Sequence, residues 1–272
     1  MEFKFSEEII ERYSAEIAMK EIGGKGLEKL INSTVGVIGA GGLGCPVIQI
    51  LTAIGIGTIK IIDADVIKRS NLARQYLHYT SDINSYKIES IKRKMIDLNP
   101  NVNLKCYNTY LNKENVEELL SDCNFVIDAS DNFATKFLIN DACVYFDIPF
   151  VIAGVQRFIG QIFSIVPGKT ACYRCIFPNI LFTEYERTCT AMGIISTTTS
   201  FAASIEANEA IKSILNLNSR FKGKLFSFDL LNDYFEFIEL KINPSCFICS
   251  KKGYPMYKYE NYELFDNRCR VK

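Results

Sequence analysis

Two cysteine pairs have the spacing of metal ligands. Cys172 and Cys175 form one CxxC motif, and Cys246 and Cys249 form a second one. Two such motifs can supply the four thiolates of a tetrahedral Zn²⁺ centre that has no open position for catalysis. We therefore predict a structural four-cysteine zinc site that ties the C-terminal part of the chain to the rest. The alternative is two unrelated pairs of free or redox-active thiols.

A glycine-rich segment has the pattern of a phosphate-binding turn. Residues 39–44 read Gly-Ala-Gly-Gly-Leu-Gly, follow a short β-branched run and precede an apolar stretch. Glycines permit a tight turn, and the N-terminus of a following helix favours an anion. Asp63 ends the next predicted strand, about twenty residues downstream, where a carboxylate can hold ribose hydroxyls. The pattern predicts nucleotide binding by Gly39, Gly41 and Gly42, with a turn that merely packs as the alternative.

Charged side chains follow the ends of several predicted strands. The carboxyl ends of parallel strands share one crevice, so we expect Asp63, Arg74, Lys87 and Asp131 to converge there. Arginine and lysine can stabilise the charge of departing pyrophosphate, and Asp131 can hold Mg²⁺. This set suits ATP with Mg²⁺ better than a dinucleotide. For each residue taken singly, the alternative is a solvated surface charge or a helix cap.

Alternating strands and helices must position these groups. Short apolar runs predict five strands, at 34–39, 58–63, 102–107, 124–129 and 149–153. Four intervening segments predict helices, at 43–56, 87–98, 113–120 and 132–145. The alternation predicts an α/β fold with a doubly wound, Rossmann-like, mostly parallel sheet. After residue 154 the pattern changes to antiparallel strands, within 160–166 and 224–240, and a long helix at 201–215 that is rich in small residues.

Composition argues against several classes of protein. The 272 residues include 31 Lys+Arg and 31 Asp+Glu, so a strongly basic nucleic-acid binder is not indicated. His78 is the one histidine, which excludes a multi-histidine metal site, and we interpret it as structural. The uncharged stretch 30–59 is long enough to span a bilayer, but its glycines favour turns between a strand, a helix and a strand.

The cysteines and the N-terminal residues indicate the cellular compartment of the protein. The first residues carry charge where a signal peptide would have its apolar core, and paired cysteines suit a reducing compartment. We therefore expect a cytoplasmic protein with no membrane association. Four further cysteines lie on predicted strands or helices and are interpreted as packing residues: Cys45, Cys106, Cys123 and Cys143.

Together the motifs resemble the E1-like adenylating family, which includes the molybdopterin-synthase and ThiF adenylyltransferases. The matching segments are Arg12-Tyr13, residues 39–44, 63–75, 85–90 and 130–132, both CxxC pairs, and Thr188-Cys189. The resemblance implies ATP-dependent activation of the C-terminal glycine carboxylate of a small ubiquitin-like sulfur carrier protein ending in Gly-Gly. The products would be an acyl-adenylate and pyrophosphate, in molybdopterin, thiamine or related cofactor biosynthesis. It also implies a homodimer.

The resemblance assigns roles to individual residues. Arg74 and Lys87 would contact the phosphates, and Asp131 with Asn132 would close the site around Mg²⁺. The residues expected to line the remainder of the nucleotide are Gly39, Gly41, Gly42, Asp63, Asp65, Ser70, Asn71, Leu72 and Gln75. Cys189 is the candidate nucleophile, since sulfur-transferring members use a cysteine here for a bond to the carrier or for persulfide transfer. An ordinary exposed thiol is the alternative.

The resemblance also sets the expected organisation of the chain. We expect a single adenylation domain over residues 1–250, followed by a tail at 251–272. Its Rossmann-like core covers about residues 30–155, and its zinc and carrier-binding part covers about 156–250. No rhodanese-like segment follows Cys249, so we expect a separate protein to supply any persulfide.

The chain departs from this family in two places. A second arginine usually follows the Arg-Tyr pair by two residues and reaches ATP in the partner subunit, but here that position is Ala15. Either Arg12 or Lys20 substitutes for it, or help across the subunits is absent. Residues 190–197, after Cys189, also differ from the family pattern, which leaves room for an atypical acceptor.

Three other functions stay open at this stage. One branch of the family adenylates the C-terminus of a short ribosomal peptide, although its usual N-terminal peptide-recognition domain does not fit in the roughly thirty residues before the first strand. An NAD(P)-binding Rossmann oxidoreductase is the second alternative. The third is a catalytically silent scaffold, which Ala15 alone favours. Nicotinamide absorbance and ATP–pyrophosphate exchange separate these alternatives.

Overall fold

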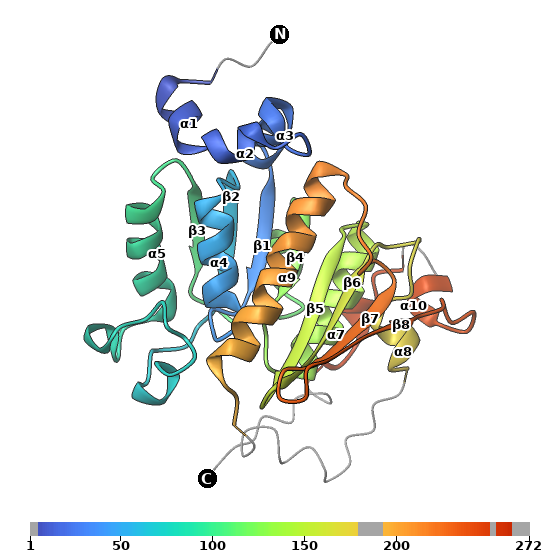
Figure 1. The fold of residues 1–272 in the computed structure, drawn as a ribbon. Helices are drawn as coiled ribbons and strands as arrows, with labels where there is room; N and C mark the ends of the chain where they lie inside the picture. The colour runs from blue at the N-terminus through green and yellow to red at the C-terminus, as the bar shows by residue number, and fades with distance from the viewer. Residues whose placement is uncertain (1–4, 179–192, 251–253, 263–272) are drawn as a thin grey trace.

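One mixed sheet organises the computed structural model, which describes residues 5–178, 193–250 and 254–262 (Figure 1). Its strand order is β3-β2-β1-β4-β5-β6-β7-β8. The strands are β1 (Thr34–Ile38), β2 (Thr58–Ile62), β3 (Asn103–Tyr107), β4 (Phe125–Asp128), β5 (Phe150–Gln156), β6 (Ile159–Ile165), β7 (Lys224–Asp229) and β8 (Tyr234–Glu239). β1 to β5 are parallel, and β6 to β8 continue the sheet antiparallel. The predicted fold class is confirmed.

Helices cover both faces of the sheet (Figure 1). They are α1 (Glu7–Arg12), α2 (Ser14–Ala18), α3 (Gly23–Ile31), α4 (Gly44–Ala53), α5 (Lys87–Leu98), α6 (Val116–Leu120), α7 (Phe133–Phe146), α8 (Tyr173–Ile176), α9 (Ser196–Leu215), α10 (Phe247–Ser250) and α11 (Met256–Tyr259). Successive side chains of a strand point to opposite faces. Val37 of β1 therefore lies in the core beneath α4, α5 and α9, whereas Ile38 lies in the core beneath α6 and α7.

Helix α9 packs closely on the sheet because its inner face is made of small side chains. Ala202, Ala203, Ala207 and Ala210 are fully buried, where they let the helix lie against α4 and β5. The helix begins at Ser196, five residues before the predicted start at 201. The run of Ser and Thr at 196–200 is typical of helix starts, and here Thr199 and Ser200 donate their hydroxyl hydrogens to the Ser196 carbonyl.

The three N-terminal helices are not apparent from the sequence pattern. Tyr13, between α1 and α2, is 2% exposed, and its hydroxyl accepts a hydrogen bond of 2.7 Å from Asn99 Nδ2. Gly55, at φ +82°, makes room for that ring, since a Cβ there would lie 2.3 Å from the hydroxyl. Arg12 donates to the Leu98 carbonyl at 3.1 Å. These contacts fasten the N-terminal segment to the end of α5.

Part of the segment expected to be a tail is packed on the domain. Within residues 254–262, helix α11 places Tyr257 against Tyr145 and Phe146, and Tyr257 is fully buried. The Tyr257 hydroxyl donates to Glu117 at 2.9 Å. Across the described ranges, no helix has the length and apolarity needed to cross a membrane.

Candidate nucleotide and zinc sites

The glycine segment forms a tight turn between β1 and α4. Gly39 has φ +99°, and a Cβ there would lie 2.6 Å from the Ala129 carbonyl oxygen. A Cβ at Gly44 would lie 2.0 Å from the Gly39 carbonyl oxygen. Only glycine fits at either position, because each would otherwise strike backbone. The turn thus brings the carboxyl ends of β1 and β4 together at the N-terminus of a ten-residue helix.

Asp63, which directly follows β2, stabilises this turn through hydrogen bonds. Its Oδ2 accepts the Ala40 N–H at 2.8 Å, and its Oδ1 accepts the Asp65 N–H at 2.7 Å. Lys87, the first residue of α5, lies between the two carboxylates, 3.2 Å from Asp63 and 2.8 Å from Asp65. Asp63 and Lys87 are both nearly buried, whereas half of the Asp65 side chain is exposed. Asp63 therefore has a structural role that the sequence did not predict, beside its expected place at the ribose.

The charges in this group stabilise one another. Burial disfavours the charged form of Lys87, but the charge of Asp63 and the hydrogen bond to Asp65 outweigh it and raise the pKa of Lys87. Burial likewise opposes ionisation of Asp65, yet the hydrogen bond and charge of Lys87 lower the pKa of Asp65. Lys87 and Asp65 are consequently both charged at neutral pH.

Arg74 and Gln75 lie beside the glycine turn. A Cβ on Gly42 would be 3.6 Å from Arg74 Cγ, and one on Gly41 would be 3.6 Å from Gln75 Nε2. Arg74 donates to the Ser70 carbonyl at 3.2 Å and remains partly exposed. Gln75 is 5% exposed, and its Oε1 has no hydrogen-bond partner among the described residues. These two predicted residues therefore meet the predicted phosphate turn.

The loop that carries Arg74 is fastened to α5. The short helix at Arg69–Asn71 is closed by the Asn71 side chain, whose Oδ1 accepts the Lys68 N–H at 2.9 Å. Further along the loop, Asp82 is 2% exposed and pairs with Lys94 and with Arg93. Lys94 also donates to the Leu77 carbonyl at 2.6 Å. The other two predicted residues of the loop, Ser70 and Leu72, are exposed and partly exposed, respectively.

Asp131 follows β4 in a turn that packs on the glycine turn. The Ala129 N–H donates to the Ile38 carbonyl at 2.9 Å, and the Ala129 carbonyl lies against Gly39. The Asp131 side chain is exposed at this edge. Asn132 caps α7, because its Oδ1 accepts the Thr135 N–H at 2.8 Å. The structure thus assigns Asn132 a capping role, and it places Asp131 on the edge where Mg²⁺ is expected.

Two further residues at this edge were missed by the sequence analysis. Thr199, on the first turn of α9, is buried, and a Cβ on Gly42 would lie 3.1 Å from its methyl group. Ser200 Oγ lies 3.2 Å from the Tyr76 hydroxyl. The run of Ser and Thr was visible in the sequence, but its proximity to the glycine turn depends on where α9 crosses the sheet. Cys189, the candidate nucleophile, lies outside the described residues.

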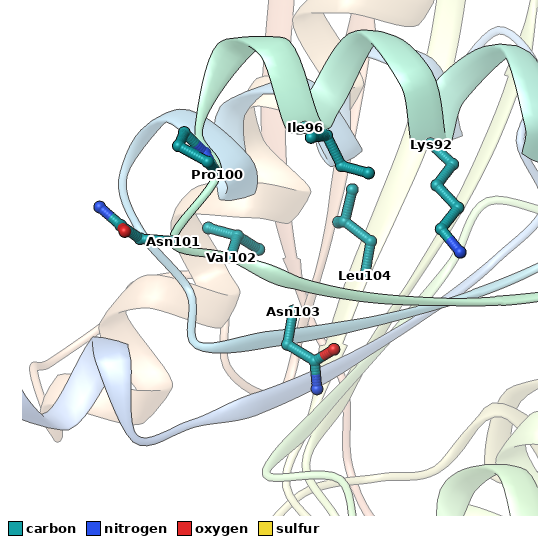
Figure 2. A pocket seen from close by; sticks show the side chains of 7 residues that line it. All are labelled: Lys92, Ile96, Pro100, Asn101, Val102, Asn103 and Leu104. Atoms are coloured by element: carbon teal, nitrogen blue, oxygen red, sulfur yellow. The ribbon is translucent and has the colours of Figure 1, made fainter.

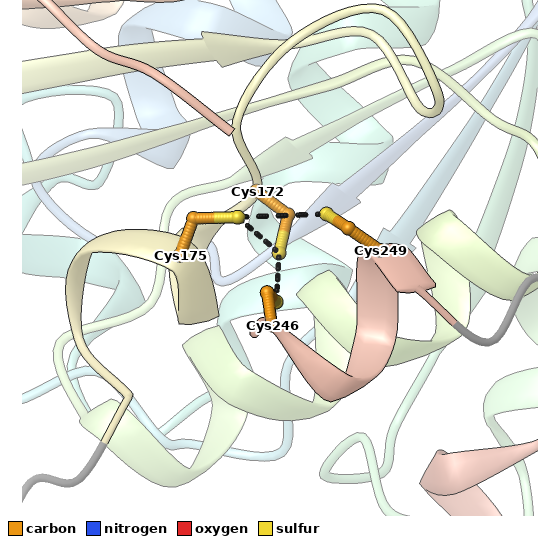
Figure 3. Close-up of side chains that lie close together, drawn as sticks. All are labelled: Cys172, Cys175, Cys246 and Cys249. Atoms are coloured by element: carbon orange, nitrogen blue, oxygen red, sulfur yellow. Dashed lines mark hydrogen bonds between the residues drawn. The ribbon is translucent and has the colours of Figure 1, made fainter. Parts of the chain in front are cut away.

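The four cysteines of the two CxxC motifs meet at one point (Figure 3). The Sγ atoms are 3.8 Å apart for Cys172 and Cys175, 3.6 Å for Cys172 and Cys246, and 3.5 Å for Cys175 and Cys249. A tetrahedron with Zn–S bonds of about 2.3 Å has edges of about 3.8 Å, so the spacing fits zinc. Hydrogen bonds from the Cys172 thiol and the Asn243 N–H lower the pKa of Cys175 to about 6.

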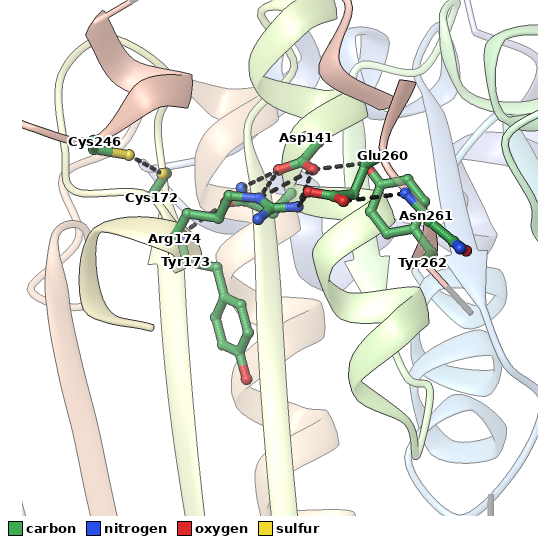
Figure 4. Close-up of polar contacts among 9 residues, drawn as sticks. Asp141, Cys172, Tyr173, Arg174, Cys246, Glu260, Asn261 and Tyr262 are labelled. Atoms are coloured by element: carbon green, nitrogen blue, oxygen red, sulfur yellow. Dashed lines mark hydrogen bonds and ion pairs between the residues drawn. The ribbon is translucent and has the colours of Figure 1, made fainter. Parts of the chain in front are cut away.

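A buried ion pair anchors the first CxxC motif to α7 (Figure 4). Arg174, between the two cysteines, donates to both oxygens of Asp141, with its Nη2 2.8 Å from Oδ2. Asp141 is 1% exposed and also accepts from the Tyr262 hydroxyl at 2.6 Å. Glu260 pairs with Arg174 at 3.2 Å. The predicted role of the cluster in tying the C-terminal segment to the sheet domain is consistent with these bonds.

The other described cysteines are unsuited to nucleophilic chemistry. Burial raises the pKa of the thiol to about 12 for Cys45 and Cys123, to about 11 for Cys106, and well above its usual value for Cys143. A buried neutral thiol is a weak nucleophile, so these residues pack the core as expected.

His78 is part of a buried chain beneath the glycine turn. Its Nε2 lies 3.6 Å from Cys45 Sγ, its Nδ1 lies 3.1 Å from Ser90 Oγ, and Cys45 donates to the Ala40 carbonyl at 3.4 Å. The ring is 3% exposed. Burial lowers the pKa of His78 to about 4, so the ring is neutral at pH 7 and acts as a structural link.

A surface depression elsewhere has a different character (Figure 2). Its lining residues are Lys92, Ile96, Pro100, Asn101, Val102, Asn103 and Leu104. They lie at the start of β3 and the end of α5, so the depression is at the amino edge of the sheet, opposite the glycine turn. It holds one charged side chain and none of the predicted site residues.

The sheet order and the glycine turn place the chain among Rossmann-like α/β proteins. Sequence comparison gives the family. Residues 13–248 match the ThiF family, and the chain belongs to it.

Relatives with assigned names extend this finding. The chain is 37% identical to the SAMP-activating enzyme E1 of Haloferax volcanii over 90% of each chain. It is 34% identical to the sulfur carrier protein adenylyltransferase of Thermus thermophilus, over 96% of this chain and 98% of the relative. The adenylyltransferase and sulfurtransferase MOCS3 of Drosophila persimilis is 35% identical, and the chain spans 58% of its length.

Solved structures show the same fold. A crystal structure of E. coli MccB with MccA has a TM-score of 0.79 at 25% identity, covering 91% of this chain and 76% of MccB. A crystal structure of E. coli MccB with ATP has a TM-score of 0.75 at 24% identity, covering 86% of this chain and 75% of MccB.

Zinc content tests the four-cysteine site. The purified chain is expected to hold about one zinc ion per molecule, because four thiolates at these distances complete a tetrahedron. Cys246→Ser should lower both the zinc content and the melting temperature, whereas Cys106→Ser, outside the cluster, should leave the zinc content unchanged. Metal analysis by mass spectrometry decides the point. A protein without metal and with all four thiols freely titratable would contradict the site.

The pH dependence of stability tests the state of His78. Its pKa is about 6.5 when unfolded and about 4 in the fold, so the unfolded state binds more protons between these values. Stability is therefore full above pH 6.5 and falls as the pH drops towards 4. Between pH 7.5 and pH 5.0, protonation linked to His78 should lower the free energy of unfolding by about 2 kcal/mol. In urea denaturation, His78→Gln should lose less stability over that interval than the wild type, and an equal loss would refute a buried neutral ring.

Proposed function

We propose that this chain uses ATP to adenylate the C-terminal glycine carboxylate of a small ubiquitin-like sulfur carrier protein. The chain is thus an E1-like adenylyltransferase of the ThiF family. One observation carries the proposal: the phosphate-type glycine turn lies at one edge with Arg74, Gln75, the Asp63–Lys87–Asp65 group and the turn of Asp131. The relatives named for sulfur carrier activation, which cover most of the chain, support the same reaction.

The residues at this edge fit ATP. The tight turn requires glycine at positions 39 and 44, because a Cβ at either one would strike backbone. Gln75 Oε1 has no hydrogen-bond partner among the described residues, so it can accept a hydrogen bond from a ligand. We propose that Arg74 and Lys87 offset phosphate charge, and that Asp65, Ser70, Asn71 and Leu72 border the nucleoside. Asp131 is an oxygen ligand of the kind Mg²⁺ prefers. Bound Mg²⁺ would supply positive charge at the phosphates.

The reaction does not require the protein to transfer a proton. A carrier carboxylate oxygen attacks the α-phosphorus of ATP, a new P–O bond forms, and the bond to the bridging oxygen of the β-phosphate breaks. The bonding electrons leave with pyrophosphate, whose charge Arg74 and Lys87 stabilise. The nucleophile is already ionised, so no general base is needed. The chain fits this requirement, because its one histidine is buried and neutral.

The sheet offers an edge for the carrier. Among the described residues β8 is the edge strand of the sheet, and its Tyr234, Phe235 and Ile238 are each at least 40% exposed. An unpaired strand edge with apolar side chains is suited to docking of another protein. We propose that the body of the carrier lies along β8.

A path of contacts leads from β8 to the glycine turn. At the tip of the β7–β8 hairpin, the Leu230 N–H donates to the Phe158 carbonyl at 2.9 Å. The adjoining Arg157 carbonyl accepts from Thr198 Oγ1, on the first turn of α9, at 3.0 Å. The neighbouring Thr199 borders Gly42. We propose that the carrier tail follows this path to the α-phosphate.

Other expectations about partners extend the proposal. We propose that the protein acts as a homodimer in the cytoplasm, that Cys189 takes part in sulfur transfer, and that a separate protein donates the persulfide. Arg12 bonds to the Leu98 carbonyl of its own chain, which weighs against Arg12 as the substitute for a second N-terminal arginine. The Lys20 side chain is 90% exposed, which makes it the more accessible candidate of the two.

Pyrophosphate exchange tests the reaction and the site together. With ATP, Mg²⁺ and a panel of carriers and peptides ending in Gly-Gly, the wild type should incorporate labelled pyrophosphate into ATP. Arg74→Ala and Asp131→Ala should each reduce exchange at least about 100-fold, because Arg74 would stabilise the departing pyrophosphate and Asp131 would hold the Mg²⁺ that offsets the same charge. Lys92→Ala, at the depression on the opposite edge of the sheet, should match the wild type.

The outcomes separate the alternatives. Exchange with a ribosomal peptide alone would favour adenylation of a peptide C-terminus, the first alternative above. ATP binding without exchange for any acceptor would favour a silent scaffold, and a nicotinamide absorbance change would favour an oxidoreductase. Near wild-type exchange in both Arg74→Ala and Asp131→Ala would overturn the site assignment.

A further inference from the structure

A buried ammonium group lies behind the turn that carries Asp131. Lys136, near the start of α7, has a side chain 8% exposed. Its Nζ lies 2.9 Å from Asp128 Oδ2, 3.0 Å from the Ser130 carbonyl and 2.7 Å from the Ala153 carbonyl. An ammonium group has three hydrogens to donate, so these three acceptors satisfy it completely. Lys136 therefore joins the end of β4, the following turn and the middle of β5.

The same turn is also held by Asp128, the last residue of β4. This carboxylate is fully buried, and its Oδ1 accepts both the N–H of Ser130, at 2.9 Å, and the hydroxyl of Ser130, at 2.5 Å. Ala129 lies between Asp128 and Ser130 in the sequence, and its carbonyl lies against Gly39 of the glycine turn. The backbone immediately before Asp131 is thus set by three side-chain bonds from Asp128 and Lys136 together with one steric contact.

The surroundings make Lys136 hard to replace. Glu206 of α9 is fully buried, and neither of its carboxyl oxygens has a hydrogen-bond partner among the described residues. Burial, and next the charge of Asp128, raise the pKa of Glu206 well above its usual value, so this side chain is neutral. Without Lys136, the buried carboxyl group of Asp128 would lose its ion-pair partner beside a second buried carboxyl group, and the turn would have to rearrange.

We infer that Lys136 is a positioning residue for the adenylation reaction, because it holds the Ser130–Asp131 turn where Asp131 can bind the Mg²⁺ of ATP. This role rests on the proposed function, because the turn can position a metal ligand only if the chain binds ATP with Mg²⁺. Lys136 itself is enclosed by backbone and Asp128, so it acts through the turn and not by touching the phosphates. Groups that orient a metal ligand typically change metal affinity 10- to 100-fold when removed.

ATP binding with and without metal tests this role apart from turnover. In calorimetric titrations of the full chain, Mg²⁺ should tighten ATP binding by the wild type relative to EDTA. Lys136→Met should lose about tenfold or more of that gain while its affinity for ATP in EDTA stays within about threefold of wild type. Lys136→Arg, which keeps a buried cation, should retain most of the gain.

Lys60 provides a matched control. It is likewise buried at 3% exposure, and its Nζ binds the Leu119 carbonyl at 2.9 Å and Asp122 at 2.5 Å, away from the turns of the site. Lys60→Met should lower the melting temperature as Lys136→Met does, yet keep the full gain from Mg²⁺. An undiminished gain in Lys136→Met, or an equal loss in Lys60→Met, would overturn the inference.

A milder variant covers the case in which Lys136→Met does not fold. Ser130→Ala removes the hydroxyl bond to Asp128 and keeps the backbone bond, so it should lose part of the gain from Mg²⁺. Wild-type behaviour of folded Ser130→Ala would then refute the role of the turn. A wild type that binds Mg²⁺ and ATP but exchanges no pyrophosphate with any acceptor would refute the proposed function alone, because the binding measurement needs no carrier.

Discussion

The hydrogen bonds of the buried Asp63 side chain determine the geometry of the candidate nucleotide site. Asp63 receives the Ala40 N–H, the Asp65 N–H and the ammonium of Lys87, and so joins the glycine turn, the end of β2 and the start of α5. Little water competes for these bonds, because Asp63 is 8% exposed. The glycine turn therefore keeps one conformation, against which the Arg74 loop and the β4 turn can pack.

Helix α7 links this edge to the cysteine cluster. Its N-cap, Asn132, directly follows Asp131, and Lys136 lies one turn further on. In its middle, Asn140 accepts the Tyr173 N–H at 2.7 Å, and Asp141 pairs with Arg174 within the first CxxC motif. One helix thus supports both the Ser130–Asp131 turn of the candidate nucleotide site and the anchor of the cysteine cluster. The C-terminal segment closes this arrangement through Tyr262 and Glu260 (Figure 4).

Prediction from sequence succeeded where a pattern is local and failed where a role depends on a distant neighbour. The α5 boundaries, 87–98, agree with its periodicity, and the strand runs agree within about two residues at most ends. Helices α1 and α2 were missed because they are short and polar and depend on the burial of Tyr13 beside Asn99. Nothing in the spacing of Lys136 or Glu206 shows that strands β4 and β5 and helix α9 bring them together.

The sequence by itself determined the class of fold, the glycine-rich turn and the two cysteine pairs that form one cluster, because each depends on residue types at short, regular intervals. Only the tertiary structure decided what the charged groups do. It showed that Asp63 braces backbone, that His78 is a neutral buried link and that Lys136 pins the turn before Asp131. The physical reason is that the role of a charge is set by its burial and its partners, and those partners come from strands and helices far apart in the chain.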